Sequence, residues 1–201
     1  MANQVKCISK EKKYEGYLQI YQYDLTVPSF DHEKEHFCIK GREVVHNADS
    51  VLVLIYVPDM DSFLFCQEFR LGVFFNEAQH DPFILEFVSG TIDKHSNPEK
   101  TAIKEVHEET GLKIDALEQI ALVYKSPGIS TEKCYLFYSE FKGQPLTGLH
   151  GLDGEEEIMT TCISRSRVYQ LMDEMKIVDA TTLLALNWFR CNKEPVNLNK
   201  S

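Results

Sequence analysis

A short helix with clear start and stop signals divides the apolar part of this chain into two groups of strands. The helix is predicted over residues 98–110, with Asn97 as its N-cap residue and Pro98 at the first helical position. Gly111 follows at the C-cap, where a left-handed backbone conformation suits glycine. A layered fold is expected, because strands on both sides of one helix can join a common sheet that helices then cover.

Apolar periodicity places the strands around this helix. Residues 17–25 alternate apolar and polar, and a second extended stretch follows at 37–46, so the N-terminal part is predicted to be a small antiparallel sheet. Two apolar runs, 51–57 and 62–69, flank the turn sequence PDMD and predict a β-hairpin. Further strands are predicted at 82–88, 116–124, 133–141 and 158–163, and further helices at 164–175 and 180–191.

These elements predict an α+β fold with α/β/α layers, in which a mixed sheet is sandwiched between helices. An N-terminal antiparallel β subdomain is expected over residues 1–47, the main domain over 48–192, and a polar tail over 193–201. A chain of 201 residues is long enough to bury one sizeable core, which makes a single main domain the expectation.

The charge balance restricts the class of ligand. The chain has 31 acidic and 21 basic residues, a formal net charge of -10, which disfavours binding to nucleic acid or to an anionic membrane surface. Its apolar runs are too short or too interrupted to span a bilayer, and its start lacks the apolar core of a secretory signal, so a cytoplasmic location is expected. The six cysteines are scattered and are predicted to be reduced, mostly buried thiols. An anionic substrate would need metal ions or a few placed cationic side chains.

Three glutamates on the predicted helix form the strongest chemical signal. Glu105, Glu108 and Glu109 stand at spacings i, i+3 and i+4, which places their carboxylates on neighbouring positions of one face. The buried stripe of the same helix is expected to consist of Ala102, Ile103 and Val106. From the cluster alone, a solvated face is the simpler interpretation. A Mg²⁺ site is the alternative, because Mg²⁺ binds a few carboxylates together with phosphate oxygens and waters.

The residues around these glutamates resemble the Nudix box, G-x5-E-x7-R-E-U-x-E-E-x-G-U with U aliphatic. The matching positions are Gly90, Glu105, Val106, Glu108, Glu109, Gly111 and Leu112. Two positions depart from the pattern, since Ser96 stands in place of a glutamate and Lys104 in place of an arginine. In the family this arginine helps to orient the catalytic glutamates, so its replacement by a point charge bears on the rate more than on the identity of the site.

Outside the box, the chain is similar to the ADP-ribose pyrophosphatase branch of the Nudix hydrolases. Matching segments occur in the same order at residues 67–74, 82–93, 126–132, 148–158 and 176–189. The resemblance implies hydrolysis of a small-molecule substrate, ADP-ribose, to AMP and ribose 5-phosphate, with Mg²⁺, or Mn²⁺ in its place. The alternatives are another nucleoside-diphosphate sugar, such as GDP-mannose or UDP-glucose, and a Nudix-fold sensor that binds ADP-ribose without cutting it. The N-terminal sheet resembles the part that pairs two subunits in this branch, so a homodimer is expected.

The resemblance also implies a metal-binding set. The ligands would be the carboxylates of Glu105 and Glu109 and the backbone carbonyl of Ser89, and Glu108 would take part in catalysis. In the implied reaction, a metal-polarised water attacks one phosphorus of the diphosphate, so no covalent enzyme intermediate is needed.

The remaining implied roles concern substrate contacts and proton transfer. Arg70 matches a phosphate-contacting arginine, and Glu86 and Glu132 match positions that hold the ribose part of the substrate. A surface ion pair for Arg70, and strand-edge or loop charges for the two glutamates, are the alternatives. The general base would be Glu156, with Glu155 as its competitor, in a loop whose acidic run is equally typical of a plain solvated surface.

Overall fold

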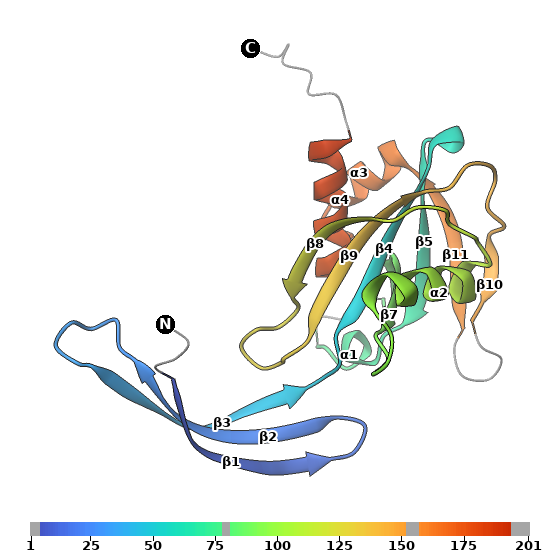
Figure 1. Cartoon of the computed structure of the whole chain (residues 1–201). Helices are drawn as coiled ribbons and strands as arrows, with labels where there is room; N and C mark the ends of the chain where they lie inside the picture. Colours follow the sequence, from blue (N-terminus) through green and yellow to red (C-terminus); the bar gives the residue numbers. More distant parts are fainter. Residues whose placement is uncertain (1–4, 78–80, 152–156, 194–201) are drawn as a thin grey trace, which may run out of the picture. The chain divides into compact units, whose positions relative to one another are not determined.

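The computed structural model describes residues 5–77, 81–151 and 157–193 and divides the chain into two compact units (Figure 1). The first unit comprises Met1–Asp49 together with Tyr124–Lys133. The second comprises Ser50–Val123 together with Cys134–Ser201, and it contains the helix that bears the three glutamates.

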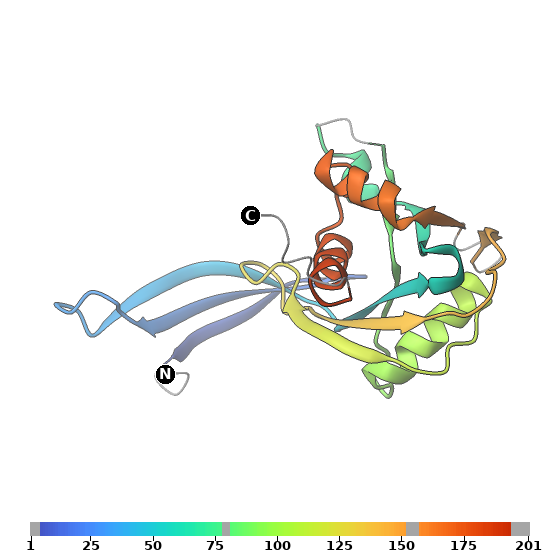
Figure 2. The same ribbon diagram turned by 90° about the horizontal axis from the view of Figure 1, so that it is seen from above.

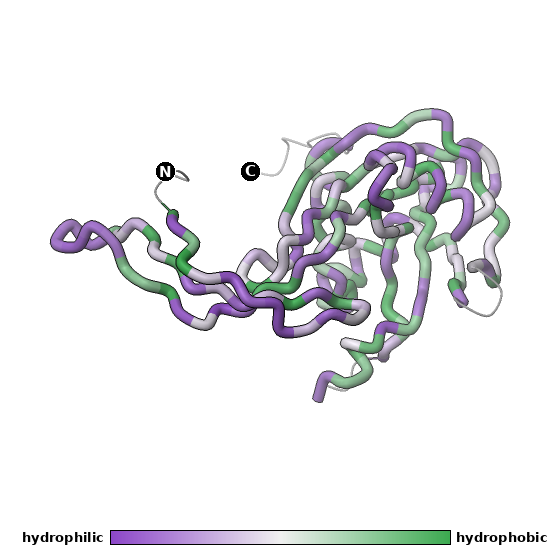
Figure 3. Tube along the Cα trace, turned by 60° about the horizontal axis from the view of Figure 1, so that its bottom comes forward, coloured by the Kyte–Doolittle hydropathy of each residue, from purple (hydrophilic) through white to green (hydrophobic). Residues whose placement is uncertain are grey.

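The first unit is built on a three-stranded antiparallel sheet in the order β1-β2-β3. Its strands are β1 (Lys6–Glu15), β2 (Gln19–Pro28) and β3 (His36–His46). Two backbone hydrogen bonds join the segment 124–133 to β3. The Val45 N–H donates to the Ile129 carbonyl at 2.8 Å, and the Thr131 N–H donates to the Val45 carbonyl at 3.1 Å. Hydrophilic and hydrophobic residues are mixed along these strands (Figure 3), and none of the unit's described residues is buried.

Strand β1 was absent from the sequence prediction, which included only the two strands that follow it. Its sequence, KCISKEKKYE, is dominated by charged and polar residues, and all ten of its positions are exposed. Its backbone pairing with β2, and not burial of its side chains, places it in the sheet, so it has no hydrophobic period for a sequence reading to detect.

Eight described strands form the sheet of the second unit. They are β4 (Ser50–Val57), β5 (Ser62–Phe69), β6 (Phe83–Glu86), β7 (Val88–Thr91), β8 (Glu118–Tyr124), β9 (Lys133–Glu140), β10 (Gly148–His150) and β11 (Ile158–Ser164). The order is β10-β11-β5-β4-β9-β8, with β6 paired to β5 and β7 paired to β4. Because β4 runs parallel to β9 and antiparallel to β5, the sheet is mixed, as predicted.

The predicted hairpin is present as β4 and β5, joined by a short 3-10 turn at Pro58–Met60. The predicted strand at 82–88 is instead two short strands, β6 and β7, which pair with different partners. Within a few residues the chain therefore changes its pairing partner from β5 to β4. This change lies directly before the segment that leads to the acidic helix.

Helices cover both faces of this sheet, which confirms the α/β/α layers (Figures 1 and 2). Helix α2 (Pro98–Thr110) covers one face, and α3 (Arg165–Asp173) and α4 (Ala180–Asn192) cover the other. A short helix, α1 (Leu71–Phe74), follows β5. The core under α2 contains Val53, Leu64, Phe137, Ala102 and Val106. The core under α3 and α4 contains Leu52, Phe65, Leu136, Val168 and Leu186.

Helix α2 begins and ends as the sequence predicts. The Asn97 side chain accepts a hydrogen bond from the Lys100 N–H at 2.8 Å, and Gly111 ends the helix with a φ of 69°. The predicted buried stripe is wrong at Ile103, whose side chain is 48% exposed. The buried positions 102, 106 and 109 lie at i, i+4 and i+7, a spacing that turns position 103 to solvent and buries Glu109.

All six cysteines are free thiols, as predicted, but the expectation that most are buried is wrong. Cys66 and Cys134 are buried, Cys162 is half-buried, and Cys7, Cys38 and Cys191 are exposed. The exposed three lie on the strands of the first unit and near the end of α4, where little apolar surface covers them. None of the described helices has the length and apolar character that a bilayer crossing requires.

Candidate active site

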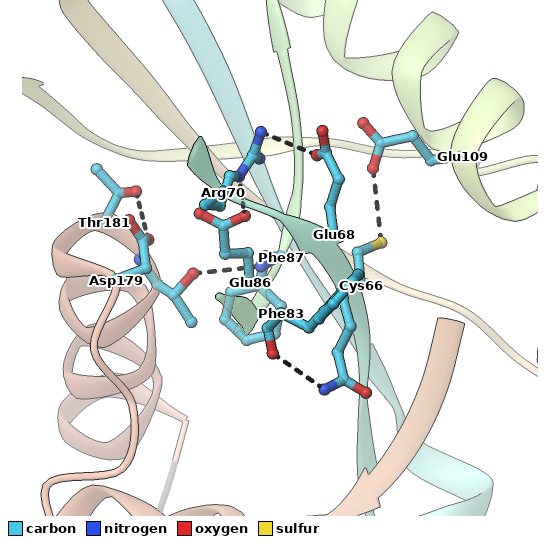
Figure 4. Close-up of polar contacts among 11 residues, drawn as sticks. Cys66, Glu68, Arg70, Phe83, Glu86, Phe87, Glu109, Asp179 and Thr181 are labelled. Atoms are coloured by element: carbon cyan, nitrogen blue, oxygen red, sulfur yellow. Dashed lines mark hydrogen bonds and ion pairs between the residues drawn. The ribbon is translucent and has the colours of Figure 1, made fainter. Parts of the chain in front are cut away.

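The buried end of α2 carries a carboxylate in an apolar setting. Glu109 is 8% exposed, and the Cys66 thiol donates a hydrogen bond from Sγ to its Oε2 at 3.5 Å (Figure 4). The backbone of Ser89 on β7 also donates to this carboxylate. Burial raises the pKa of Glu109 to about 8, and the nearby charges of Glu105 and Glu68 act in the same direction. A cation beside this carboxylate would relieve both effects.

Glu105 lies against Gly90 on β7. A Cβ at position 90 would stand 2.3 Å from Cδ of Glu105, closer than any real contact, so only glycine leaves room for this carboxylate. The box glycine therefore has a steric function here, since β7 and α2 approach so closely that the Glu105 side chain takes the place of a residue-90 side chain.

Lys104 holds the outer carboxylates of α2. Its Nζ lies 2.8 Å from Glu108 Oε2 and 3.5 Å from Glu105 Oε1. The hydrogen bond with Glu108 and the charge of Glu105 raise the pKa of Lys104, so it remains cationic. One ammonium group therefore contacts two of the three glutamates on α2.

Arg70 is clamped between two carboxylates at the end of β5 (Figure 4). Its Nε lies 2.7 Å from Glu86 Oε2 and its Nη1 lies 2.9 Å from Glu68 Oε2. The guanidinium is about one third exposed, so its charge is accessible to a ligand. A guanidinium fork suits a diphosphate, because it can donate two parallel hydrogen bonds to phosphate oxygens.

Residues at the start of α4 contact the backbone next to Glu86 and add negative charge near it. Asp179, the N-cap of α4, accepts a hydrogen bond from the Thr182 N–H at 2.6 Å. Thr182 in turn accepts one from the N–H of Phe87, the residue after Glu86, at 3.2 Å. Burial raises the pKa of Glu86, against the opposing effect of Arg70, and the negative charge of Asp179 adds to the rise. Glu86 is therefore held at a fixed place among other acids, with Arg70 as its cationic partner.

The donor set on α2 and β7 fits a hard divalent cation. Mg²⁺ prefers oxygen ligands, and α2 offers the buried carboxylate of Glu109 and the half-buried carboxylate of Glu105 where it faces β7. Ser89 on β7 contacts Glu109 through its backbone N–H. As the side chains stand, no three Asp, Glu, His or Cys residues within the described ranges are grouped closely enough to hold a metal ion.

The predicted site residues are distributed over both units. Those in the second unit are Arg70, Glu86, Ser89, Glu105, Glu108 and Glu109. The structure brings Ser89 to Glu109 and Arg70 to Glu86, whereas exposed Glu108 pairs with Lys104. Glu132 belongs to the first unit, where it forms an ion pair of 3.2 Å with Lys125. Glu155 and Glu156 lie outside the described residues, so the choice of general base stays a prediction.

Two site residues were missing from the sequence reading. Cys66 and Glu68 alternate with Arg70 along one face of β5, and they contact Glu109 and Arg70 respectively. The period-2 alternation of a strand could have identified both, because residues 66 and 68 must point to the same side as Arg70.

Comparisons with known proteins identify the family of this chain. The NUDIX domain family matches residues 46–180. An ADP-ribose pyrophosphatase from Haemophilus influenzae is 27% identical over 190 residues, which cover 94% of this chain and 87% of that protein. A GDP-mannose pyrophosphatase from Cronobacter sakazakii is 30% identical over 145 residues, 72% of this chain and 75% of that protein. A solved structure described as an ADP compounds hydrolase shares the fold, with a TM-score of 0.69, 16% identity and coverage of 93% of this chain and 92% of that chain. The chain therefore belongs to the NUDIX family and is a Nudix-type hydrolase that resembles the ADP-ribose pyrophosphatases.

Proposed function

We propose that this chain hydrolyses the diphosphate bond of ADP-ribose to AMP and ribose 5-phosphate and that it requires Mg²⁺, with Mn²⁺ as a substitute. The supporting observation is the clamped Arg70 in the same unit as the carboxylates of α2. A diphosphate needs both features, because the acids alone would repel it and the arginine alone would bind it without promoting cleavage.

In the proposed reaction, the residues of α2 and β7 prepare a place for the cation. Glu105, Glu109 and the Ser89 carbonyl would hold Mg²⁺, which when bound lowers the pKa of an attacking water and neutralises charge on the diphosphate. Gly90 leaves the space in which Glu105 lies. Lys104 contacts both Glu105 and Glu108, so its positive charge offsets the repulsion between these carboxylates while no cation is bound.

The substrate contacts follow from the remaining acids and from Arg70. Arg70 would exchange one of its carboxylate partners for a phosphate oxygen while the other continues to fix the guanidinium plane. Glu86 and Glu132 are proposed to accept hydrogen bonds from the ribose part. Glu156, or Glu155 in its place, is proposed to take the proton of the attacking water.

A second candidate substrate is another nucleoside-diphosphate sugar. The GDP-mannose pyrophosphatase relative supports it, because it is 30% identical to this chain over 145 residues. Both substrates present the same diphosphate to Arg70 and to α2, so only the contacts to the base and to the distal sugar separate them.

A substrate panel tests the proposal. Purified protein is incubated with ADP-ribose, GDP-mannose or UDP-glucose, in Mg²⁺ or in EDTA, and the nucleotide products are quantified. Release of AMP and ribose 5-phosphate from ADP-ribose in Mg²⁺, lost in EDTA, is the expected result. Preferred cleavage of GDP-mannose would select the second candidate, and tight binding of ADP-ribose without cleavage would show a sensor.

The proposal includes a homodimer formed through the first unit. No described residue of this unit is buried. Several of its large apolar side chains are exposed to solvent, and Ile8, Tyr17 and Phe30 expose 61%, 100% and 95% of their surface. A three-stranded sheet with no covered face gains little stability by itself, and large exposed apolar side chains are typical of an interaction surface. Sedimentation at micromolar protein should give twice the mass of one chain. A single-chain mass would contradict the dimer.

A further inference from the structure

We propose that Cys66 is a positioning residue, whose thiol holds the Glu109 carboxylate in the orientation required for cation binding. The inference rests on the proposed function, and it adds to the metal site a residue that supplies no ligand. The Cys66 thiol contacts Glu109 from the side of β5. The expected metal ligands, in contrast, lie on α2 and β7.

The geometry ties one strand to one helix through this contact. Cys66 is 4% exposed and Glu109 is 8% exposed, and the Sγ–Oε2 distance of 3.5 Å lies within hydrogen-bonding range for sulfur. The thiol donates to the carboxylate oxygen, and in the ionised state that binds a cation the carboxylate can only accept. β5 is a central strand that pairs with β4, β6 and β11, so the sheet fixes the position of the Cys66 Sγ. The hydrogen bond from this fixed thiol then restrains the orientation of the Glu109 carboxylate.

A thiol has three properties that suit this place. It is neutral, so it adds no cation that would compete with a metal ion, as a lysine or arginine would. It is apolar enough to pack among the core residues Leu64, Val88 and Val106 of the same cluster. It is also a weak donor, so it orients the carboxylate while taking little of its capacity to bind a cation.

The same contact also lowers the free-energy cost of burying the Glu109 charge. A carboxylate that lacks donors in an apolar setting carries a large desolvation cost, and the Ser89 backbone and the Cys66 thiol both donate to Glu109. Without the thiol, Glu109 is expected to turn away from β5 toward a better-hydrated position, and the cation site would lose its fixed oxygen.

Two substitutions separate positioning from packing. Cys66→Val keeps an apolar side chain of similar volume and removes the donor, whereas Cys66→Ser keeps a donor. Cys134→Val is the matched control, because Cys134 is buried to the same degree in the opposite core, under α3 and α4. Thermal unfolding of all three variants confirms that they are folded before binding is compared.

The readout is the affinity for Mn²⁺, measured directly by electron paramagnetic resonance of the unbound ion, together with the Mg²⁺ concentration that gives half-maximal turnover of ADP-ribose. Loss of one hydrogen bond to a charged group should weaken Mn²⁺ binding about tenfold in Cys66→Val and raise the half-maximal Mg²⁺ concentration similarly. Cys66→Ser should stay within about twofold of the wild type, and Cys134→Val should match the wild type in both readouts.

Equal Mn²⁺ affinity in Cys66→Val and the wild type would overturn the inference. Equal weakening in Cys66→Val and Cys66→Ser would also overturn it, because the thiol would then matter only for its size and packing. The binding readout separates this inference from the proposed function. A wild-type protein that binds Mn²⁺ and does not cleave ADP-ribose would refute the function, while the order of Mn²⁺ affinities among the variants would still decide the role of Cys66.

Discussion

Replacement of Glu109 by glutamine should stabilise the protein when divalent cations are removed. A rise of the carboxyl pKa from 4.5 to about 8 corresponds to a loss of at most about 5 kcal/mol of folding free energy at high pH. Local relaxation and entry of water reduce this value, so we expect Glu109→Gln to gain about 2 kcal/mol at pH 8. In a chain of this size such a gain raises the Tm by about 4–8 °C.

The pH dependence of this gain has a definite sign. Between pH 4.5 and about 8, the folded protein binds more protons at Glu109 than the unfolded chain does, so wild-type stability falls as pH rises through this window. Below pH 4.5 the carboxyl is protonated in both states, and the wild type and the variant should converge. Added Mg²⁺ should stabilise the wild type more than the variant, because it binds the folded state through the charge that the variant lacks.

Thermal unfolding in EDTA between pH 5 and 9, followed by circular dichroism, measures both effects. Glu99→Gln is the matched control, because Glu99 is an exposed acid in the first turn of the same helix. Parallel pH profiles for the wild type and Glu109→Gln would refute the reasoning, since they would mean that burial imposes no cost on this carboxylate.

Three other substitutions probe neighbouring parts of the structure. Gly90→Ala should lower turnover about tenfold or more while the protein stays folded, because the new Cβ displaces Glu105; steady-state kinetics and circular dichroism check this together. Arg70→Lys should raise the KM for ADP-ribose about tenfold, because an ammonium group cannot make the two-pronged phosphate contact; an unchanged KM would exclude Arg70 from the substrate site. Asn97→Ala should cost about 1 kcal/mol of stability by removing the acceptor for the Lys100 N–H, with turnover unchanged, and a thermal melt paired with an activity assay measures both.

The layered core was predictable because its signals are local. Caps at Asn97 and Gly111 delimit α2, and continuous apolar runs mark β4 and β5, so local chemistry and the observed fold agree. The NUDIX match and the positions of Arg70, Glu105 and Glu109 in one unit agree with the resemblance that these residues suggested. The roles of the individual side chains are still predictions.

Other features depend on contacts that no local pattern encodes. Strand β1 is held by backbone pairing, so its charged sequence carries no apolar period. Ile103 is exposed because the helix turns Glu109 inward, and a buried carboxylate runs against the usual burial rule. The Cys66–Glu109 contact joins residues that are distant in sequence, and it became visible only once β5 and α2 were packed together.

The rate of AMP release from ADP-ribose in Mg²⁺ tests the central claim most directly, when the wild type is compared with Glu109→Gln and Glu99→Gln. We predict that Glu109→Gln loses about a hundredfold or more of turnover with its fold intact, and that Glu99→Gln keeps the wild-type rate. Near-normal turnover in Glu109→Gln, or an equal loss in both variants, would contradict the claim that the buried carboxylate of α2 makes the diphosphate bond hydrolysable.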